Sequence, residues 1–322
     1  MNPSPPSPPI RGRGASGPTI LAKCSRKPII TASGLVAVAR AGMKIHTLTI
    51  VGVGLIGGSI GLAARRRGLV EHIVGVGRQQ ASLDQALAVG AIDEASLDLS
   101  AAVRQAAIAV FCTPVDHIAE QVLAAAPGCA SGTLLTDAGS TKAAIVHGIE
   151  SNIPNGLHFV GSHPLAGSEK RGPEHADADL FEGRLTIVTP TRGTDSSAVA
   201  KTLGFWQALG SRVRVMSPED HDQALAVTSH LPHVAASALA GILPPPLHEL
   251  TATGFRDTTR IAAGDPALWT GILVQNRAAV LDALGALQDR LMEYKRALMA
   301  NDRTALDALL AQAKRTRDAL GS

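Results

Sequence analysis

Apolar and polar residues follow two different patterns in the two halves of this chain. From Lys44 to about Met216, short apolar runs of strand length alternate with longer segments of helical periodicity. The runs that predict strands read HTLTIVG, HIVGVG, AAIAVFC, GTLLTD, LHFVGSHP and RLTIVTP. Alternation of strand and helix is typical of a parallel, doubly wound sheet, so we expect an α/β domain over residues 44–216.

The remaining residues, 217–322, carry no strand signal. Their apolar positions recur with helical spacing, and the pattern is interrupted at Pro244–Pro246 and at Gly264–Pro266. We therefore expect an all-α second domain. Two domains also suit a chain of 322 residues, because single cores stop growing efficiently at about 250 residues.

Residues 1–43 fit neither domain. They are rich in Pro, Ser, Gly and Arg and contain six basic residues but no acidic one. We expect a disordered extension, which is either a targeting peptide or an upstream segment that precedes a start at Met43. The rest of the chain contains 27 acidic and 24 basic residues. This slightly acidic net charge does not favour a nucleic-acid partner.

Composition excludes further classes of protein. Cys24, Cys112 and Cys129 have no CxxC or metal-like spacing, so we expect a reducing compartment, the cytoplasm, and no metal site. No run approaches the roughly 18 apolar residues that a membrane-spanning helix needs. Aromatic residues make up 2% of the chain although 45% is apolar, so aliphatic side chains must fill the core.

Three glycines follow the first predicted strand with the spacing G-x-G-x-x-G. They are Gly52, Gly54 and Gly57, and a helical segment begins among them. Such glycines allow a tight turn, close approach of a diphosphate, and close packing of helix on strand. An ordinary glycine-rich turn has the same letters, but the strand-turn-helix context favours a Rossmann-type dinucleotide site that includes Leu55 and Ile56.

The end of the second predicted strand bears on the choice of cofactor. An acidic residue about 20 positions after the glycines would bind the ribose 2′-hydroxyl of NAD. Here Gly77 occupies that position and Arg78 follows. An uncharged position beside a guanidinium suits a 2′-phosphate, so we predict NADP over NAD, although Arg78 could equally be a solvated loop residue.

A further contact with the cofactor is predicted after the third strand. The segment FCTPVDHI places Thr113 and Pro114 at the sheet edge where ligands collect in open α/β sheets. A plain strand-to-helix turn explains these two residues equally well.

Four later segments contain unusual polar residues. DAGSTK contains Ser140, GSHPLAGSEKRG contains His163, SHLPH contains Ser229 and His233, and FRDTTRIA contains Arg260. Each has an ordinary explanation by itself, since helical histidines are often buried core residues and arginines beside an aspartate often form solvated ion pairs. Their combination after a dinucleotide fold favours a substrate site.

Together these motifs resemble one enzyme family. GVGLIGGSIG, DAGSTK, GSHPLAGSEKRG, SPEDHD, SHLPH and FRDTTRIA occur in the order typical of the prephenate and arogenate dehydrogenases of tyrosine biosynthesis. The resemblance extends from about Ile45 to the C-terminal helices. It implies oxidative decarboxylation of prephenate to 4-hydroxyphenylpyruvate, or of arogenate to tyrosine, with hydride transfer to NAD(P)+.

The resemblance also assigns roles to individual residues. His163 matches the family's catalytic histidine, which accepts the substrate hydroxyl proton, and Ser140 matches the serine that orients that hydroxyl and the histidine. Arg260 matches an arginine that binds a substrate carboxylate. His233 and Ser229 match substrate-binding residues, and Glu169 matches a carboxylate that gates the site or faces the substrate side chain.

The resemblance further implies a homodimer formed through the helical domain, with a small-molecule substrate as the other partner. Two competing functions remain at this stage. A β-hydroxyacid or 6-phosphogluconate-type dehydrogenase shares the domain order, but typically uses a catalytic lysine where this chain offers SHLPH. A noncatalytic nucleotide-binding interaction protein would have no need for the set Ser140, His163, His233 and Arg260.

Overall fold

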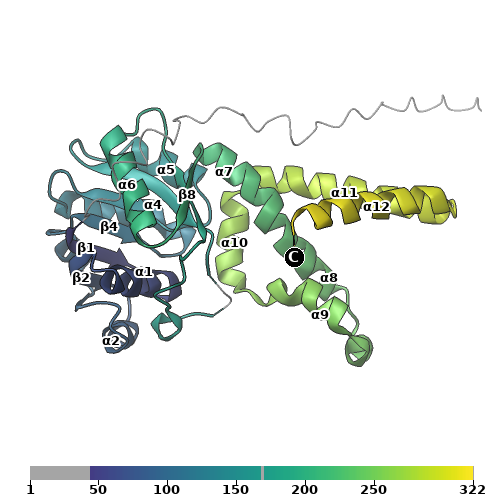
Figure 1. Ribbon diagram of the computed structural model, residues 1–322, viewed down its shortest axis with the longest axis horizontal. Coiled ribbons are helices and arrows are strands. Elements are labelled where there is room, and N and C mark those ends of the chain that lie inside the picture. Colours follow the sequence, from purple (N-terminus) through teal and green to yellow (C-terminus); the bar gives the residue numbers. More distant parts are fainter. Residues whose placement is uncertain (1–43, 168–169, 322) are drawn as a thin grey trace, which may run out of the picture.

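The computed structural model describes residues 44–167 and 170–321. Within them, one eight-stranded sheet has the strand order β3-β2-β1-β4-β5-β6-β7-β8. A helical region follows and extends away from the sheet (Figure 1). The strands are β1 Ile45–Val51, β2 Val70–Val76, β3 Glu94–Ser96, β4 Ile108–Phe111, β5 Leu134–Asp137, β6 His158–Pro164, β7 Leu185–Thr189 and β8 Arg212–Val215. The predicted extension 1–43 and Glu169 lie outside the described residues.

Helices cover both faces of the sheet, which confirms the predicted doubly wound fold. The helices of this region are α1 Leu55–Arg66, α2 Gln80–Ala88, α3 Leu99–Ala102, α4 Val115–Ala125, α5 Ala143–Glu150 and α6 Ser196–Ala208. Side chains of α1, α2 and α6 pack in one core with the strands, and those of α3, α4 and α5 pack in a second core. Because both faces are covered, a central strand such as β4, IAVF, is continuously apolar and buried.

One pair of strands departs from the parallel arrangement. Strands β1 to β6 pair in parallel, but β7 pairs antiparallel to β6. The connection between β6 and β7 contains only the short 3₁₀ turn η3, Pro173–His175, among its described residues. A parallel return would require a crossover connection, usually a helix, so this chain returns in the opposite direction.

The second region is all-helical, as predicted. It contains α7 Pro218–Leu225, the π-helical turn η4 Ala226–His230, α8 Leu231–Gly241, η5 Pro245–Leu250, α9 Thr253–Thr259, η6 Arg260–Ala263, α10 Pro266–Gln275, α11 Arg277–Met299 and α12 Arg303–Ala319. Its near end contacts the sheet region: α10 packs on α4, and α7 packs on α5 and β7. Helices α11 and α12 form a hairpin that points away from the sheet (Figure 1).

The helical hairpin buries little of its apolar surface within the chain. Helix α12 has no buried residue, and the largest apolar side chains along α11 and α12 are exposed, Met299 by 79% and Leu310 by 61%. In the described part of the chain, no helix has the length and apolar character to span a bilayer.

Candidate active site

The residues predicted to carry the chemistry follow four neighbouring parallel strands. The glycine turn follows β1, Thr113 follows β4, Ser140 follows β5, and His163 is the penultimate residue of β6. Because these strands are parallel, their carboxyl ends share one edge of the sheet. Three strand spacings of about 4.8 Å separate β1 from β6, so the glycine turn and His163 lie roughly 15 Å apart along that edge.

The glycine turn has the geometry of a dinucleotide cradle. Gly52 has φ +91°, and an added Cβ would lie 2.9 Å from Thr113 Cγ2. A Cβ on Gly57 would lie 2.2 Å from the Gly52 carbonyl oxygen, so only glycine allows α1 to begin so close to β1. Gly54, the N-cap of α1, has open space around its missing side chain. A diphosphate can therefore approach the helix N-terminus, where Leu55 and Ile56 begin the first turn.

The end of β2 carries no acidic side chain. Gly77 directly follows Val76, and Arg78 beside it is exposed. An added Cβ on Gly77 would lie 3.1 Å from Leu83 of α2, which makes the position tight for a larger residue. At the end of β4, Thr113 donates a hydrogen bond to Gln121 Oε1 at 2.6 Å, and Pro114 is the N-cap of α4.

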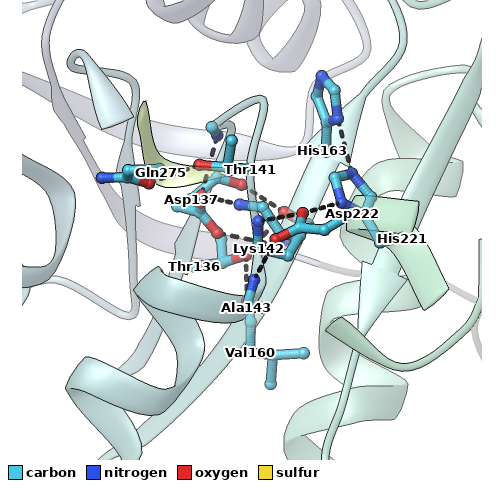
Figure 2. A network of polar contacts seen from close by, with 12 residues as sticks. Thr136, Asp137, Thr141, Lys142, Ala143, Val160, His163, His221, Asp222 and Gln275 are labelled. Atoms are coloured by element: carbon cyan, nitrogen blue, oxygen red, sulfur yellow. Dashed lines mark hydrogen bonds and ion pairs between the residues drawn. The ribbon is translucent and has the colours of Figure 1, made fainter. Parts of the chain in front are cut away.

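His163 is the end of a buried line of hydrogen-bonded side chains. Its Nδ1 lies 2.9 Å from His221 Nε2, and His221 Nδ1 lies 2.8 Å from Asp222 Oδ1. Both histidines are at least nine-tenths buried. The second ring nitrogen of His163, Nε2, points away from this line (Figure 2). We call this chain the Asp222–His221–His163 line.

A buried ion pair lies beside the line. Lys142 Nζ donates to Asp137 Oδ2, and both side chains are fully buried. The Asp137 carboxylate also accepts from the backbone amides of Gly139 at 2.9 Å and Ser162 at 3.0 Å. Figure 2 shows the pair between the end of β5 and α5, on the side of the site away from His163 Nε2. The pair thus fixes the turn that contains Ser140.

Burial keeps the histidines of this region neutral. Desolvation, with the nearby His221 and Lys142, lowers the pKa of His163 well below its ordinary value. Desolvation also lowers the pKa of His221, although Asp222 opposes that shift. The backbone amides and His221 hold the Asp222 pKa below its ordinary value against desolvation, so Asp222 remains a carboxylate. A neutral imidazole at the sheet edge can accept a proton at neutral pH.

The helical region contributes a second group of histidines. His230 ends the π-helical turn η4 and is buried, and burial lowers its pKa to about 4. Asn276 Nδ2 lies 3.0 Å from His230 Nδ1 and donates to the Asp222 carbonyl oxygen at 2.8 Å. His233 stacks on Trp269 with ring centroids 3.6 Å apart, and its buried Nδ1 has no hydrogen-bond partner among the described residues. An orphaned imidazole nitrogen is available to a ligand.

The other predicted substrate residues lie near these histidines. Ser229 belongs to the same π-helical turn and is half-buried. Arg260 begins η6, which packs on α8 and so lies near His233, and its side chain is exposed. Ser140 is half-buried and makes no side-chain hydrogen bond to another described residue.

Two acidic residues that follow His163 in the sequence form hydrogen bonds with helix α1. Asp179 pairs with Arg66 at 2.6 Å, and the Asp177 backbone amide donates to Ser59 Oγ at 2.9 Å. Both contacts hold this loop against α1. Asp179 therefore belongs to an exposed ion pair that joins this loop to α1.

The sequence motifs did not predict the Asp222–His221–His163 line. His221 and Asp222 occur in SPEDHD, which also reads as an ordinary helix start with Ser217 as N-cap, and Ser217 does accept from the Asp220 amide. Lys142 occurs in DAGSTK, where nothing in the local sequence indicates that its side chain is buried against Asp137. A usable signal was the adjacent His-Asp pair, because the two side chains can hydrogen-bond each other.

Comparisons with known proteins agree with this geometry. The family model of the prephenate dehydrogenase nucleotide-binding domain matches residues 60–215, and that of the prephenate dehydrogenase dimerization domain matches residues 217–312. The cyclohexadienyl dehydrogenase of Zymomonas mobilis is 33% identical over 280 residues, which are 85% of this chain and 95% of that protein. The prephenate dehydrogenase of Bacillus subtilis is 36% identical over 243 residues, which are 73% of this chain and 66% of that protein.

Solved structures show the same architecture. Prephenate dehydrogenase from Aquifex aeolicus, in complex with hydroxyphenyl propionate and NAD+, superposes with a TM-score of 0.81 at 32% identity over 85% of this chain and 98% of that one. Synechocystis arogenate dehydrogenase superposes with a TM-score of 0.73 at 32% identity over 85% of this chain and 99% of that one. The matched residues, the fold and the strand-edge site place this chain in the prephenate dehydrogenase family of oxidoreductases.

Proposed function

We propose that the protein oxidatively decarboxylates prephenate, arogenate or both, with hydride transfer to a nicotinamide cofactor. The observation that carries the proposal is a buried, neutral His163 on the same sheet edge as a dinucleotide cradle. The relatives named above, which act on prephenate, cyclohexadienyl and arogenate substrates, support it. A β-hydroxyacid dehydrogenase is disfavoured by membership of this family.

The residues of this chain account for the steps of that reaction. Bound nicotinamide supplies the hydride acceptor. His163 Nε2 accepts the proton of the ring hydroxyl while the substrate carboxylate leaves as carbon dioxide, and aromatisation of the ring drives the reaction. Arg260 binds a substrate carboxylate through charge-assisted hydrogen bonds. Ser140 orients the hydroxyl, and His233 and Ser229 contact the substrate; Glu169 is assigned to the substrate side chain by resemblance alone.

Cofactor and substrate preferences are tested by one set of assays. The value of kcat/KM is measured for prephenate and for arogenate, each with NAD+ and with NADP+. We expect a preference for NADP+, because Arg78 is exposed at the end of β2 and no carboxylate stands at Gly77. A strong preference for NAD+ would reject that cofactor assignment. Binding of cofactor without turnover of either substrate would instead favour a noncatalytic protein.

Arg260→Ala is expected to raise the apparent KM for the substrate about tenfold or more with a smaller change in kcat, because a charge-assisted carboxylate contact is lost. The matched control is Arg256→Ala, one turn earlier on α9 and also exposed. Steady-state kinetics at saturating cofactor measure both. An unchanged KM in Arg260→Ala, or an equal rise in the control, would contradict the assignment.

The exposed apolar side chains of α11 and α12 support a homodimer formed through the helical region. The name of the matched dimerization-domain family supports the same assembly. Sedimentation velocity tests it, and a monomer would contradict the proposed dimer. A cytoplasmic location is proposed because the two described cysteines, Cys112 and Cys129, are free thiols.

A further inference from the structure

We propose that Asp222 and His221 are positioning residues that fix the tautomer of His163, so that its Nε2 always presents a lone pair to the substrate. The inference rests on the proposed role of His163 as proton acceptor. It assigns a function to the HD pair of the SPEDHD motif. The geometry determines the direction of each hydrogen bond in the Asp222–His221–His163 line, beginning at the carboxylate.

The first step is the Asp222 carboxylate. Its Oδ1 accepts from the Lys142 backbone amide at 2.8 Å, and its Oδ2 accepts from the Ala143 amide at 2.9 Å. A carboxylate held by two amides can only accept. His221 Nδ1, 2.8 Å from Oδ1, must therefore be the donor.

The second step is the state of His221. Its ring is fully buried, so it carries a single proton, and the contact with Asp222 places that proton on Nδ1. His221 Nε2 is then an acceptor. Lys142 lies in the same cluster, and its positive charge further disfavours the protonated, charged form of the His221 ring.

The third step transfers this constraint to His163. Its Nδ1 lies 2.9 Å from His221 Nε2, which can only accept, so His163 Nδ1 donates. The neutral His163 ring has no second proton, and its Nε2 must carry a lone pair. The opposite tautomer would bring two lone pairs together at 2.9 Å, and Nε2 could then not act as a base.

Burial and the groups around the line, above all His221 and Lys142, lower the pKa of His163 and keep its ring neutral before the reaction. The groups that face the line are the carboxylates of Asp137 and Asp222, the ammonium of Lys142 and the neutral ring of His230. With both histidines of the line neutral, this cluster carries one net negative charge. A proton that moves from the substrate hydroxyl to Nε2 brings the cluster to neutrality, while the Nδ1 proton remains donated to His221.

Two substitutions of His221 separate a positioning role from a packing role. In His221→Phe the ring volume remains but the acceptor is lost, whereas in His221→Gln the side-chain oxygen can occupy the place of Nε2 and accept from His163 Nδ1. Heteronuclear NMR of protein labelled in the histidine ring nitrogens reports the tautomer without substrate, and the spectrum of His163→Asn identifies the signals. His147→Phe is the control, because His147 also contacts a carboxylate, Glu219, but at the surface.

We expect the native His163 ring to be protonated on Nδ1. His221→Phe should shift His163 toward the Nε2-protonated form and lower kcat about tenfold or more with KM nearly unchanged, and His221→Gln should restore both the tautomer and most of kcat. Native His163 protonated on Nε2, or equal effects of Phe and Gln, would overturn the inference. A correct tautomer in a protein that turns over neither prephenate nor arogenate would overturn only the proposed function.

Discussion

His163→Asn should lower kcat by about two orders of magnitude or more, with a modest change in the substrate KM. The substitution removes the base that accepts the hydroxyl proton, and general-base assistance typically contributes about 10²–10⁴-fold. The neighbouring residues that would bind substrate, His233 and Arg260, belong to the helical region and are not altered. Steady-state kinetics with the preferred substrate and cofactor measure both constants.

The pH profile provides an independent check on the same residue. Burial lowers the pKa of His163, and the neutral ring is the active form. Native kcat/KM should therefore fall only at pH values below about 6.5, the ordinary histidine pKa, and the acid limb should be lost in His163→Asn. Cofactor binding by the variant, followed by fluorescence titration, should match that of the native protein. A variant that retains native kcat would refute the assignment of His163 as the base.

Asp137→Asn should reduce the free energy of unfolding by about 3–5 kcal/mol, which is typical when one partner of a buried ion pair is removed. Lys142 is fully buried, and desolvation already lowers its pKa, so loss of the opposing carboxylate leaves an ammonium without compensation. Two backbone amides, of Gly139 and Ser162, also lose a charged acceptor. Denaturant unfolding with a constant m-value measures the change.

The control for Asp137→Asn is an ion pair on the surface. Arg290 and Glu293 pair at 2.8 Å on α11 with both side chains nearly half exposed, and Glu293→Gln should change stability by less than about 0.5 kcal/mol. The double variant Asp137→Asn/Lys142→Met should recover part of the loss, because no unpaired charge remains. Equal stability of Asp137→Asn and native protein would show that the buried pair contributes nothing.

The apolar pattern predicted the fold because each buried strand of the sheet is an apolar run with a turn signal after it. Strand β3, Glu94–Ser96, was missed since three partly exposed residues give no such signal. The run RLTIVTP correctly predicted strand β7, but not its antiparallel direction, because direction depends on the connection and the apolar run is the same either way. The parallel direction of β1 and β6 was sufficient to predict that the glycine turn and His163 lie on the same edge of the sheet.

The site was predictable where a motif carries its own chemistry, as with Gly52 and His163. The polar line behind His163 was not, because His221 and His163 are 58 positions apart and meet only when α7 packs on α5 and β7. The polar residues around Lys142 in the sequence suggest an exposed side chain. Lys142 is nevertheless buried, because β5 and α5 pack around its ion pair with Asp137. Such pairings are properties of tertiary packing, and local sequence does not encode them.

Asp222 also joins the two regions of the protein. Helix α5 has no side-chain cap from its own sequence, and the two amides at its start are satisfied by Asp222 from α7 across the domain junction. Asn276, between α10 and α11, donates to the Asp222 carbonyl oxygen from within the helical region. A hinge that opened at this junction would remove the cap of α5 and break the hydrogen bonds that align His163, so we expect α5 and α7 to stay together when substrate and cofactor enter.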